Sequence, residues 1–216
     1  MHQPRQFRIG DPRALAQAID DAPFATLITS DGDGGIDADH LPLLRDFGAT
    51  AAAGERLLGH IARANPLAER LNEAGAIEAM AIFHGPQAYI TPTWYPAKRE
   101  HGRVVPTWNY QVVHVHGVVK RIEDADWLLA HLNSLTARFE TDQPSPWSVD
   151  DAPSDFIARL CGAIVGIELV IQRIDGTRKA SQHKSLAERE AIYRGLQVAP
   201  GFDPATARTL SGMDDA

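Results

Sequence analysis

The alternation of apolar and β-branched residues with turn residues predicts a chain dominated by β-strands. Residues 24–29 form the clearest strand, and the glycine- and aspartate-rich residues 30–35 that follow predict a turn. Residues 39–44 are the returning arm of this hairpin, where Pro42 favours an edge position or a bulge because proline has no N–H to donate. Further strands are predicted at residues 57–60, 79–91, 112–122 and 164–174, the last closed by a turn at 175–176.

Capping residues and helical periodicity predict helices between these strands. Asp11 followed by Pro12 is typical of a helix start and predicts a helix over residues 11–20. Leucines recur on one helical face of residues 127–139. Further helices are predicted at residues 65–74, 154–160 and 186–196.

Together these elements predict a mainly β fold, an antiparallel barrel with helices packed outside it. No Gly-x-Gly-x-x-Gly turn and no P-loop is present, which disfavours a Rossmann fold and a P-loop nucleotide site. The length of 216 residues favours a single domain over residues 1–203. Residues 204–216 are small and polar, so we expect a flexible tail there.

Composition and charge narrow the function classes. The net charge is −7 and the Lys and Arg residues are scattered, which disfavours nucleic-acid binding because such proteins usually present a basic face. Cys161 is the only cysteine, so an intrachain disulfide is impossible, and we expect the thiol to be buried and inert. No apolar run reaches the roughly 20 residues that span a bilayer. We therefore expect a cytoplasmic protein with no membrane partner.

Residues 59–66 carry the first candidate for binding chemistry. A strand here runs into a helix start marked by Asn65 and Pro66. Free backbone N–H groups at that start, together with Arg63, suit a phosphate. The alternative is a plain helix cap with a solvent-exposed arginine.

Three other places combine polar and aromatic residues. The aromatic, proline and histidine residues of 83–96 could line a flat ligand or form the wall of a core. His114 and His116 lie two apart on a strand and point to the same face, which suits a metal, although packed or surface histidines are the commoner outcome. Residues 178–185 precede the last helix and form either a ligand contact or a simple loop. No catalytic triad, Cys-His pair or paired carboxylates are legible.

Taken in order, the motifs of the chain resemble the PaiB family, described as FMN-binding negative transcriptional regulators. The resemblance covers residues 23–196. It rests on PFATLI at 23–28, HLPLL at 40–44, GHIARANP at 59–66, FHGP at 83–86, WYP at 94–96, EHGRVVPTWNY at 100–110, HVHG at 114–117 and SQ at 181–182.

The resemblance implies an antiparallel FMN-binding split β-barrel with peripheral helices, related to pyridoxamine phosphate oxidase and flavin reductases. Such proteins are homodimers that hold FMN in a groove between the subunits. By this likeness Arg63 meets the phosphate and the strand at 40–44 runs beside the flavin. The implied cofactor-binding set is His40, Leu41, Pro42, Leu43, His60, Arg63, Trp108, Asn109, Lys179, Ser181 and Gln182.

Two departures from the split-barrel oxidases weaken the expected cofactor site. Those oxidases carry arginine and lysine on the strand that here has only His40, and their Arg-Leu-Ser-Pro-like segment is replaced by residues 179–182. Fewer cations weaken phosphate binding, so we expect FMN to be loosely held. Their substrate pocket is not carried over.

Three functions stay open at this stage. A flavin-dependent redox protein or sensor, which as an enzyme would be an FMN-dependent oxidoreductase, follows from the motifs. A negative transcriptional regulator follows only from the family description, and both the acidic charge and the lack of a legible helix-turn-helix stand against direct DNA binding. Haem or metal held by histidines is a weaker hypothesis, because related split barrels include haem-handling proteins.

Overall fold

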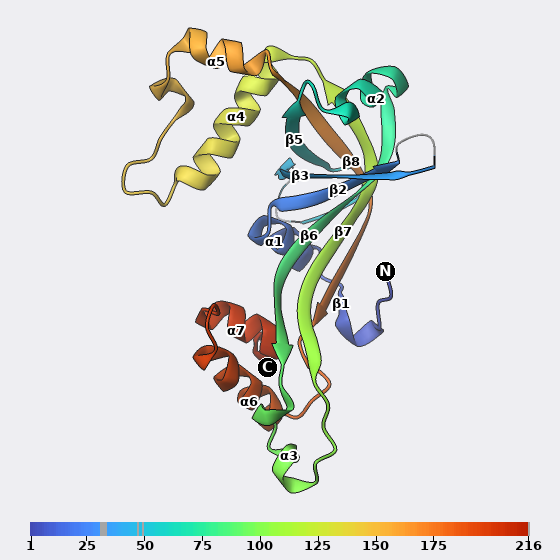
Figure 1. Ribbon diagram of the computed structural model, residues 1–216, viewed down its shortest axis with the longest axis vertical. Helices are drawn as coiled ribbons and strands as arrows, with labels where there is room; N and C mark the ends of the chain where they lie inside the picture. Colours follow the sequence, from blue (N-terminus) through green and yellow to red (C-terminus); the bar gives the residue numbers. More distant parts are fainter. Residues whose placement is uncertain (31–33, 47, 49, 216) are drawn as a thin grey trace. The chain divides into compact units, whose positions relative to one another are not determined.

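The computed structural model describes residues 1–30, 34–46, 48 and 50–215 (Figure 1). These residues divide into two compact units, each assembled from segments far apart in the chain. Unit 1 consists of the described residues of 1–22, 83–114 and 175–216, and unit 2 of those of 23–82 and 115–174. Three long strands contribute to both units, and the expectation of a single domain over residues 1–203 stays a prediction.

Unit 2 is built on an antiparallel sheet whose strands run in the order β3-β2-β6-β7-β8-β5-β4. In the hairpin of β2 and β3, Phe24 lies opposite Pro42 and Ser30 opposite Ile36; residues 31–33 of its turn lie outside the described part of the chain. The strands are β2 (Phe24–Ser30), β3 (Ile36–Pro42), β4 (Leu44–Asp46), β5 (Arg56–Ala62) and the unit 2 portions of β6 (Ala76–Ile90), β7 (Thr107–Ile122) and β8 (Ile164–Lys179) (Figure 1).

The sheet curls so that β3, at one end of the strand order, lies against β5 near the other end. Just after β5, Asn65 Nδ2 donates to Asp39 Oδ1 of β3 at 2.6 Å. Gly59 of β5 allows the close approach, because a Cβ there would lie 3.2 Å from both Leu41 Cδ1 and the Pro42 carbonyl oxygen of β3. This curled sheet confirms the predicted split β-barrel and places Pro42 on an edge strand, as its missing N–H predicted.

Unit 2 also contains α2 (Pro66–Ala74), α4 (Ala125–Glu140), the 3₁₀ turn η3 (Val149–Asp151) and α5 (Ser154–Cys161). Trp127 of α4 packs directly on Gly166 of β8, where a Cβ would lie 2.3 Å from the indole Cζ3. The strands bury the apolar core of this unit, which includes Leu27, Leu57, Ala81, Val115, Val119, Ile167 and Leu169.

Unit 1 packs helices against the remaining portions of the long strands. Its elements are η1 (Arg5–Phe7), β1 (Arg8–Ile9), α1 (Pro12–Asp21), η2 (Pro92–Trp94), α3 (Ala97–Glu100), α6 (Leu186–Val198), α7 (Pro204–Ser211) and η4 (Met213–Asp215). Its core is formed by Ala88, Ile90, Tyr95, Ile192, Leu196, Ala207 and Leu210. Among the described residues, no helix is long and apolar enough to cross a membrane.

Two expectations are corrected in unit 1. The turn expected at 175–176 lies inside β8, because Gly176 pairs with Ile9 of β1 and so continues the strand. The flexible tail expected from residue 204 begins instead with α7, which Asp203 caps by accepting from Thr206 N. Leu210 of this helix is buried in the core of unit 1, which fixes it in place.

Candidate functional site

The eleven sequence-predicted cofactor residues fall into two groups, one in each unit. Unit 2 contains His40, Leu41, Pro42, Leu43, His60 and Arg63, and unit 1 contains Trp108, Asn109, Lys179, Ser181 and Gln182.

Residues 40–43, at the end of β3 and just after it, alternate between the surface and the core. Leu41 and Leu43 are buried, so their side chains belong to the barrel core and only their backbone can meet a ligand. His40 is exposed and shares a hydrogen bond of 3.2 Å between its Nδ1 and Thr26 Oγ1. With half-buried Pro42, His40 is the part of this segment that faces outward.

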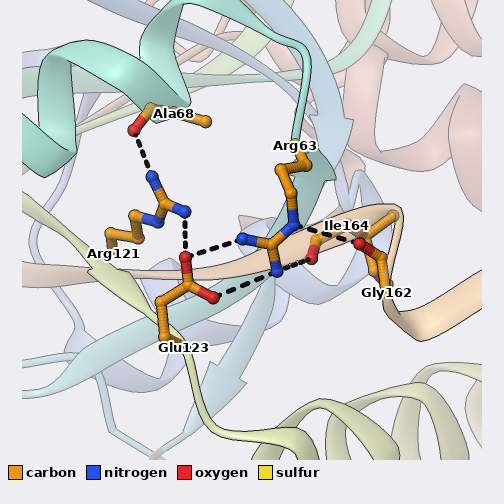
Figure 2. A network of polar contacts seen from close by, with 6 residues as sticks. All are labelled: Arg63, Ala68, Arg121, Glu123, Gly162 and Ile164. Carbon is orange, nitrogen blue, oxygen red and sulfur yellow. Dashed lines mark hydrogen bonds and ion pairs between the residues drawn. The ribbon is translucent and has the colours of Figure 1, made fainter. Parts of the chain in front are cut away.

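Arg63 lies between β5 and α2 and holds a carboxylate in a two-pronged contact (Figure 2). Its Nη1 donates to Glu123 Oε1 at 2.8 Å and its Nη2 to Glu123 Oε2 at 3.0 Å. The same guanidinium donates to two backbone carbonyls, from Nε to Gly162 at 3.0 Å and from Nη2 to Ile164 at 3.2 Å. The guanidinium plane is therefore fixed by contacts on two sides.

A second arginine reaches the same carboxylate from β7. Arg121 Nη2 donates to Glu123 Oε1, and Arg121 Nη1 donates to the carbonyl of Ala68 in α2 at 2.8 Å (Figure 2). Glu123 thus accepts from two guanidinium groups. Sequence reasoning identified Arg63 but missed Arg121 and Glu123, because nothing local links residues 60 positions apart.

The start of α2 supplies fewer free N–H groups than expected. Leu67 N donates to the side chain of Asn65 at 2.8 Å, and Ala68 N donates to the Asn65 carbonyl at 2.8 Å. Pro66 has no N–H to offer. The helix start is therefore a self-capped terminus, and an anion at this place would depend on Arg63.

Half-buried His60 contacts the buried ring of His131, a contact that the sequence reasoning also missed. Its Nδ1 lies 3.2 Å from Nε2 of His131 in α4, and the His131 ring stacks on Trp127 at 5.3 Å between centroids. His131 Nδ1 is buried with no hydrogen-bond partner. Burial, and secondarily His60, lower the pKa of His131 to about 4. The signal available in the sequence was that His131 follows Leu128 by three positions on the apolar face of α4.

Asn109 and Ser181 of unit 1 are turned toward each other inside its core. Asn109 Nδ2 donates to Ser181 Oγ at 2.9 Å and to the carbonyl of Leu210 in α7 at 2.8 Å. Both residues are buried, and Ser181 has a backbone φ of 60°, unusual for a residue with a Cβ. This arrangement ties β7, the loop after β8 and α7 together.

The other three residues of this group differ in accessibility. Gln182 is half-buried, and its Oε1 accepts from Ala180 N at 2.8 Å. Lys179 Nζ donates to the Trp108 carbonyl at 2.9 Å, and burial lowers the pKa of Lys179. The Trp108 ring is 54% exposed and meets Tyr89 edge to face. Trp108 is therefore the member of the group with the most surface open to a ligand.

His114, His116 and Cys161 complete the sequence candidates. Both histidines are half-buried, and within the described part of the chain no group of three or more His, Cys, Asp or Glu side chains is placed to hold a metal ion. Cys161 is half-buried rather than fully buried. It lies on the wall of a cavity of about 580 Å³ formed by α4, η3 and α5, which Arg63 and Glu123 also line.

Comparison with known proteins gives one family match and several relatives. The family model described as Putative FMN-binding domain matches residues 1–173. An uncharacterised protein of Aspergillus fumigatus is 31% identical over 223 residues, covering 85% of each chain. Protease synthase and sporulation protein PAI 2 of Bacillus subtilis is 29% identical over 198 residues, covering 91% of this chain and 89% of the relative.

Among solved structures, the FAD and heme binding protein from Mycobacterium smegmatis has a TM-score of 0.55 at 16% identity, covering 87% of this chain and 80% of that chain. At this identity the likeness concerns the fold alone. The matches confirm the family resemblance, the split-barrel fold and the flavin as cofactor of the family, all of which the motifs predicted.

Proposed function

Because the chain belongs to the Putative FMN-binding domain family, we propose that it is a flavin-dependent redox protein or sensor with an FMN site on the barrel of unit 2. Bound FMN supplies the ability to accept and return electrons, while the protein binds and orients it. The residues of this chain therefore have to recognise a phosphate and a flat ring.

The observation that carries the proposal is the guanidinium of Arg63, just after β5, whose two Nη atoms both donate to the carboxylate of Glu123. A phosphate, like a carboxylate, presents two oxygens that can accept the two parallel N–H bonds of a guanidinium, so the donor geometry fits it. Arg63 would hold the phosphate, and the outward-facing His40 and Pro42 of β3 would flank the ring. With a single guanidinium fork and no further cation on β3, loose binding of FMN is expected.

In unit 1 the proposal separates residues open to a ligand from residues that hold the structure. Trp108 offers an exposed ring, and Lys179 offers a cation beside it. Asn109 and Ser181 are occupied with each other in the core, so we assign them to positioning the loop after β8.

We also propose that the working form is a homodimer, as in the split barrels that hold FMN between subunits. Light scattering during size-exclusion chromatography tests this directly. A monomer that retains FMN would contradict the proposed dimer and leave the proposed flavin site unaffected.

The flavin site is tested by titrating the protein with FMN and with riboflavin, which lacks the phosphate, while following flavin fluorescence. In the Arg63→Ala variant we expect FMN affinity to fall about tenfold to a hundredfold, because a charge-assisted hydrogen bond contributes about 1.5–3 kcal/mol. Riboflavin affinity should not change. Lys120→Ala, which removes an exposed cation from β7 next to Arg121, is the matched control.

The outcomes separate the parts of the proposal. An unchanged FMN-to-riboflavin ratio in Arg63→Ala would place the phosphate elsewhere. Failure of the wild-type protein to bind either flavin would remove the flavin function.

A negative transcriptional regulator is the second candidate, and it rests on the resemblance of the chain's motifs to the PaiB family, to which the motifs at residues 23–196 point. The net charge of −7 argues that such a role would act through another protein rather than through direct contact with phosphates. Retention of a promoter fragment at low salt, lost as salt is raised, would contradict that expectation and favour direct DNA binding.

A further inference from the structure

Glu123 occupies a junction that the proposed flavin site does not explain. It follows the end of β7 and precedes Asp124, the N-cap of α4. Arg63, its partner, lies at the junction of β5 and α2, and the carbonyls that share this arginine lie where α5 leads into β8. The β5–α2, β7–α4 and α5–β8 junctions of unit 2 are therefore linked through Arg63, which bonds to Glu123 and to the two carbonyls (Figure 2).

The N–H groups of Arg63 are nearly all in use. Of its five donors, the Nε–H is held by Gly162, one Nη2–H by Ile164, and one N–H on each of Nη1 and Nη2 by Glu123. An incoming phosphate can take the two-pronged position only by replacing Glu123. The two carbonyl contacts do not depend on Glu123, so the fork would keep its orientation during such an exchange.

The displaced carboxylate has a place to go. Glu123 is about half exposed, and it already shares Oε1 with Arg121, which stays anchored to the carbonyl of Ala68. If the Glu123 carboxylate turned from Arg63 toward Arg121, it would therefore still have an ion-pair partner and contact with water.

We propose that Glu123 is a built-in competitor for the anion site of Arg63, closing the fork when no ligand is bound and moving to Arg121 when a flavin phosphate enters. The inference rests on the proposed flavin function, and it names the residue that sets how tightly the phosphate is held. It gives a second reason to expect loose binding of FMN, since each binding event has to break an existing ion pair.

The test compares FMN and riboflavin affinities in wild type and in Glu123→Gln. The amide keeps the size of the side chain but loses the charge, so we expect FMN to bind about tenfold more tightly and riboflavin to bind as in wild type. The matched control is Asp126→Asn, which removes a carboxylate from the wall of the same cavity without contacting Arg63. Asp126→Asn should change FMN affinity less than twofold.

Each other outcome overturns a distinct part. Equal tightening by Glu123→Gln and Asp126→Asn would mean general charge repulsion, and weaker FMN binding by Glu123→Gln would mean that Glu123 positions Arg63; either result refutes the competitor. If Arg63→Ala also leaves the ratio of FMN affinity to riboflavin affinity unchanged, the proposed phosphate site itself fails, and with it this inference.

If the Glu123→Gln variant unfolds more than a few degrees below wild type, Glu123→Asp replaces it in the test. Its carboxylate is set back by one methylene group and so contacts Arg63 less closely, and tighter FMN binding than in wild type is again expected, although the retained charge makes the change smaller than in Glu123→Gln.

Discussion

The buried His131 of unit 2 makes the free energy of unfolding depend on pH. His131 is 4% exposed, its Nε2 faces His60, and its ring lies on Trp127. Its pKa falls from 6.5 to about 4 in the folded protein. The folded state thus favours the neutral ring, so this contribution to stability is fully present above pH 6.5 and is lost as pH falls toward 4.

The magnitude follows from the difference between the two pKa values. Between 6.5 and about 4 it corresponds to about 3 kcal/mol in total, because each pKa unit is worth about 1.4 kcal/mol. Most of the change lies between the two values, so lowering the pH from 7 to 5 should remove about 2 kcal/mol of the free energy of unfolding.

Urea unfolding of wild type and His131→Phe at pH 7 and pH 5 measures how much of the pH dependence of the free energy of unfolding comes from His131. Phenylalanine keeps an aromatic ring against Trp127 but does not titrate, so the loss of stability between the two pH values should be about 2 kcal/mol smaller in the variant. Burial also lowers the pKa of His60, but His60 is present in both proteins and its effect largely cancels. His84→Phe, an exposed position on β6, is the control. Equal pH dependence in wild type and His131→Phe would refute the reasoning.

Two further predictions concern backbone positions with little freedom. Gly166→Ala places a Cβ 2.3 Å from the Trp127 ring, so we expect a loss of about 1–3 kcal/mol in the free energy of unfolding, measured in urea; an unchanged value would mean that α4 is not held by this contact. Ser181→Gly and Ser181→Ala remove the same hydroxyl, but at a φ of 60° glycine should be more stable than alanine by about 1 kcal/mol. Thermal unfolding of the two variants checks the order, and alanine equal to glycine would contradict it.

Elements whose signals are local were predictable from the sequence. Asp11 and Pro12 begin α1 as expected, because a cap needs only the residues next to it. The hairpin of β2 and β3 was likewise predicted from alternating residues around a turn. These short-range patterns predicted an antiparallel barrel, and the family resemblance specified a split barrel.

The parts that the sequence did not predict depend on distant partners. Gly176 was expected to lie in a turn, yet it continues β8 because Ile9 pairs with it and Leu15 packs where a side chain would be. In the same way, α7 is held by the core of unit 1 rather than by its own small residues. The ion pair of Arg63 and Glu123 also joins residues far apart in the chain. The sequence therefore indicated an anion site at Arg63 but not that Glu123 occupies it.

The position of β8 late in the chain bears on how the protein is made. In unit 2 this strand pairs with β5, and in unit 1 it pairs with β1 at the beginning of the chain. During translation neither pairing can form until residues 164–179 have left the ribosome. Until then, the edges of β1 and β5 that pair with β8 stay unpaired. Such long-range pairing requires closing large loops before any contact is gained, which makes folding slow. Until β8 has left the ribosome, the nascent chain exposes unpaired strand edges, which are the kind of surface that chaperones protect from aggregation.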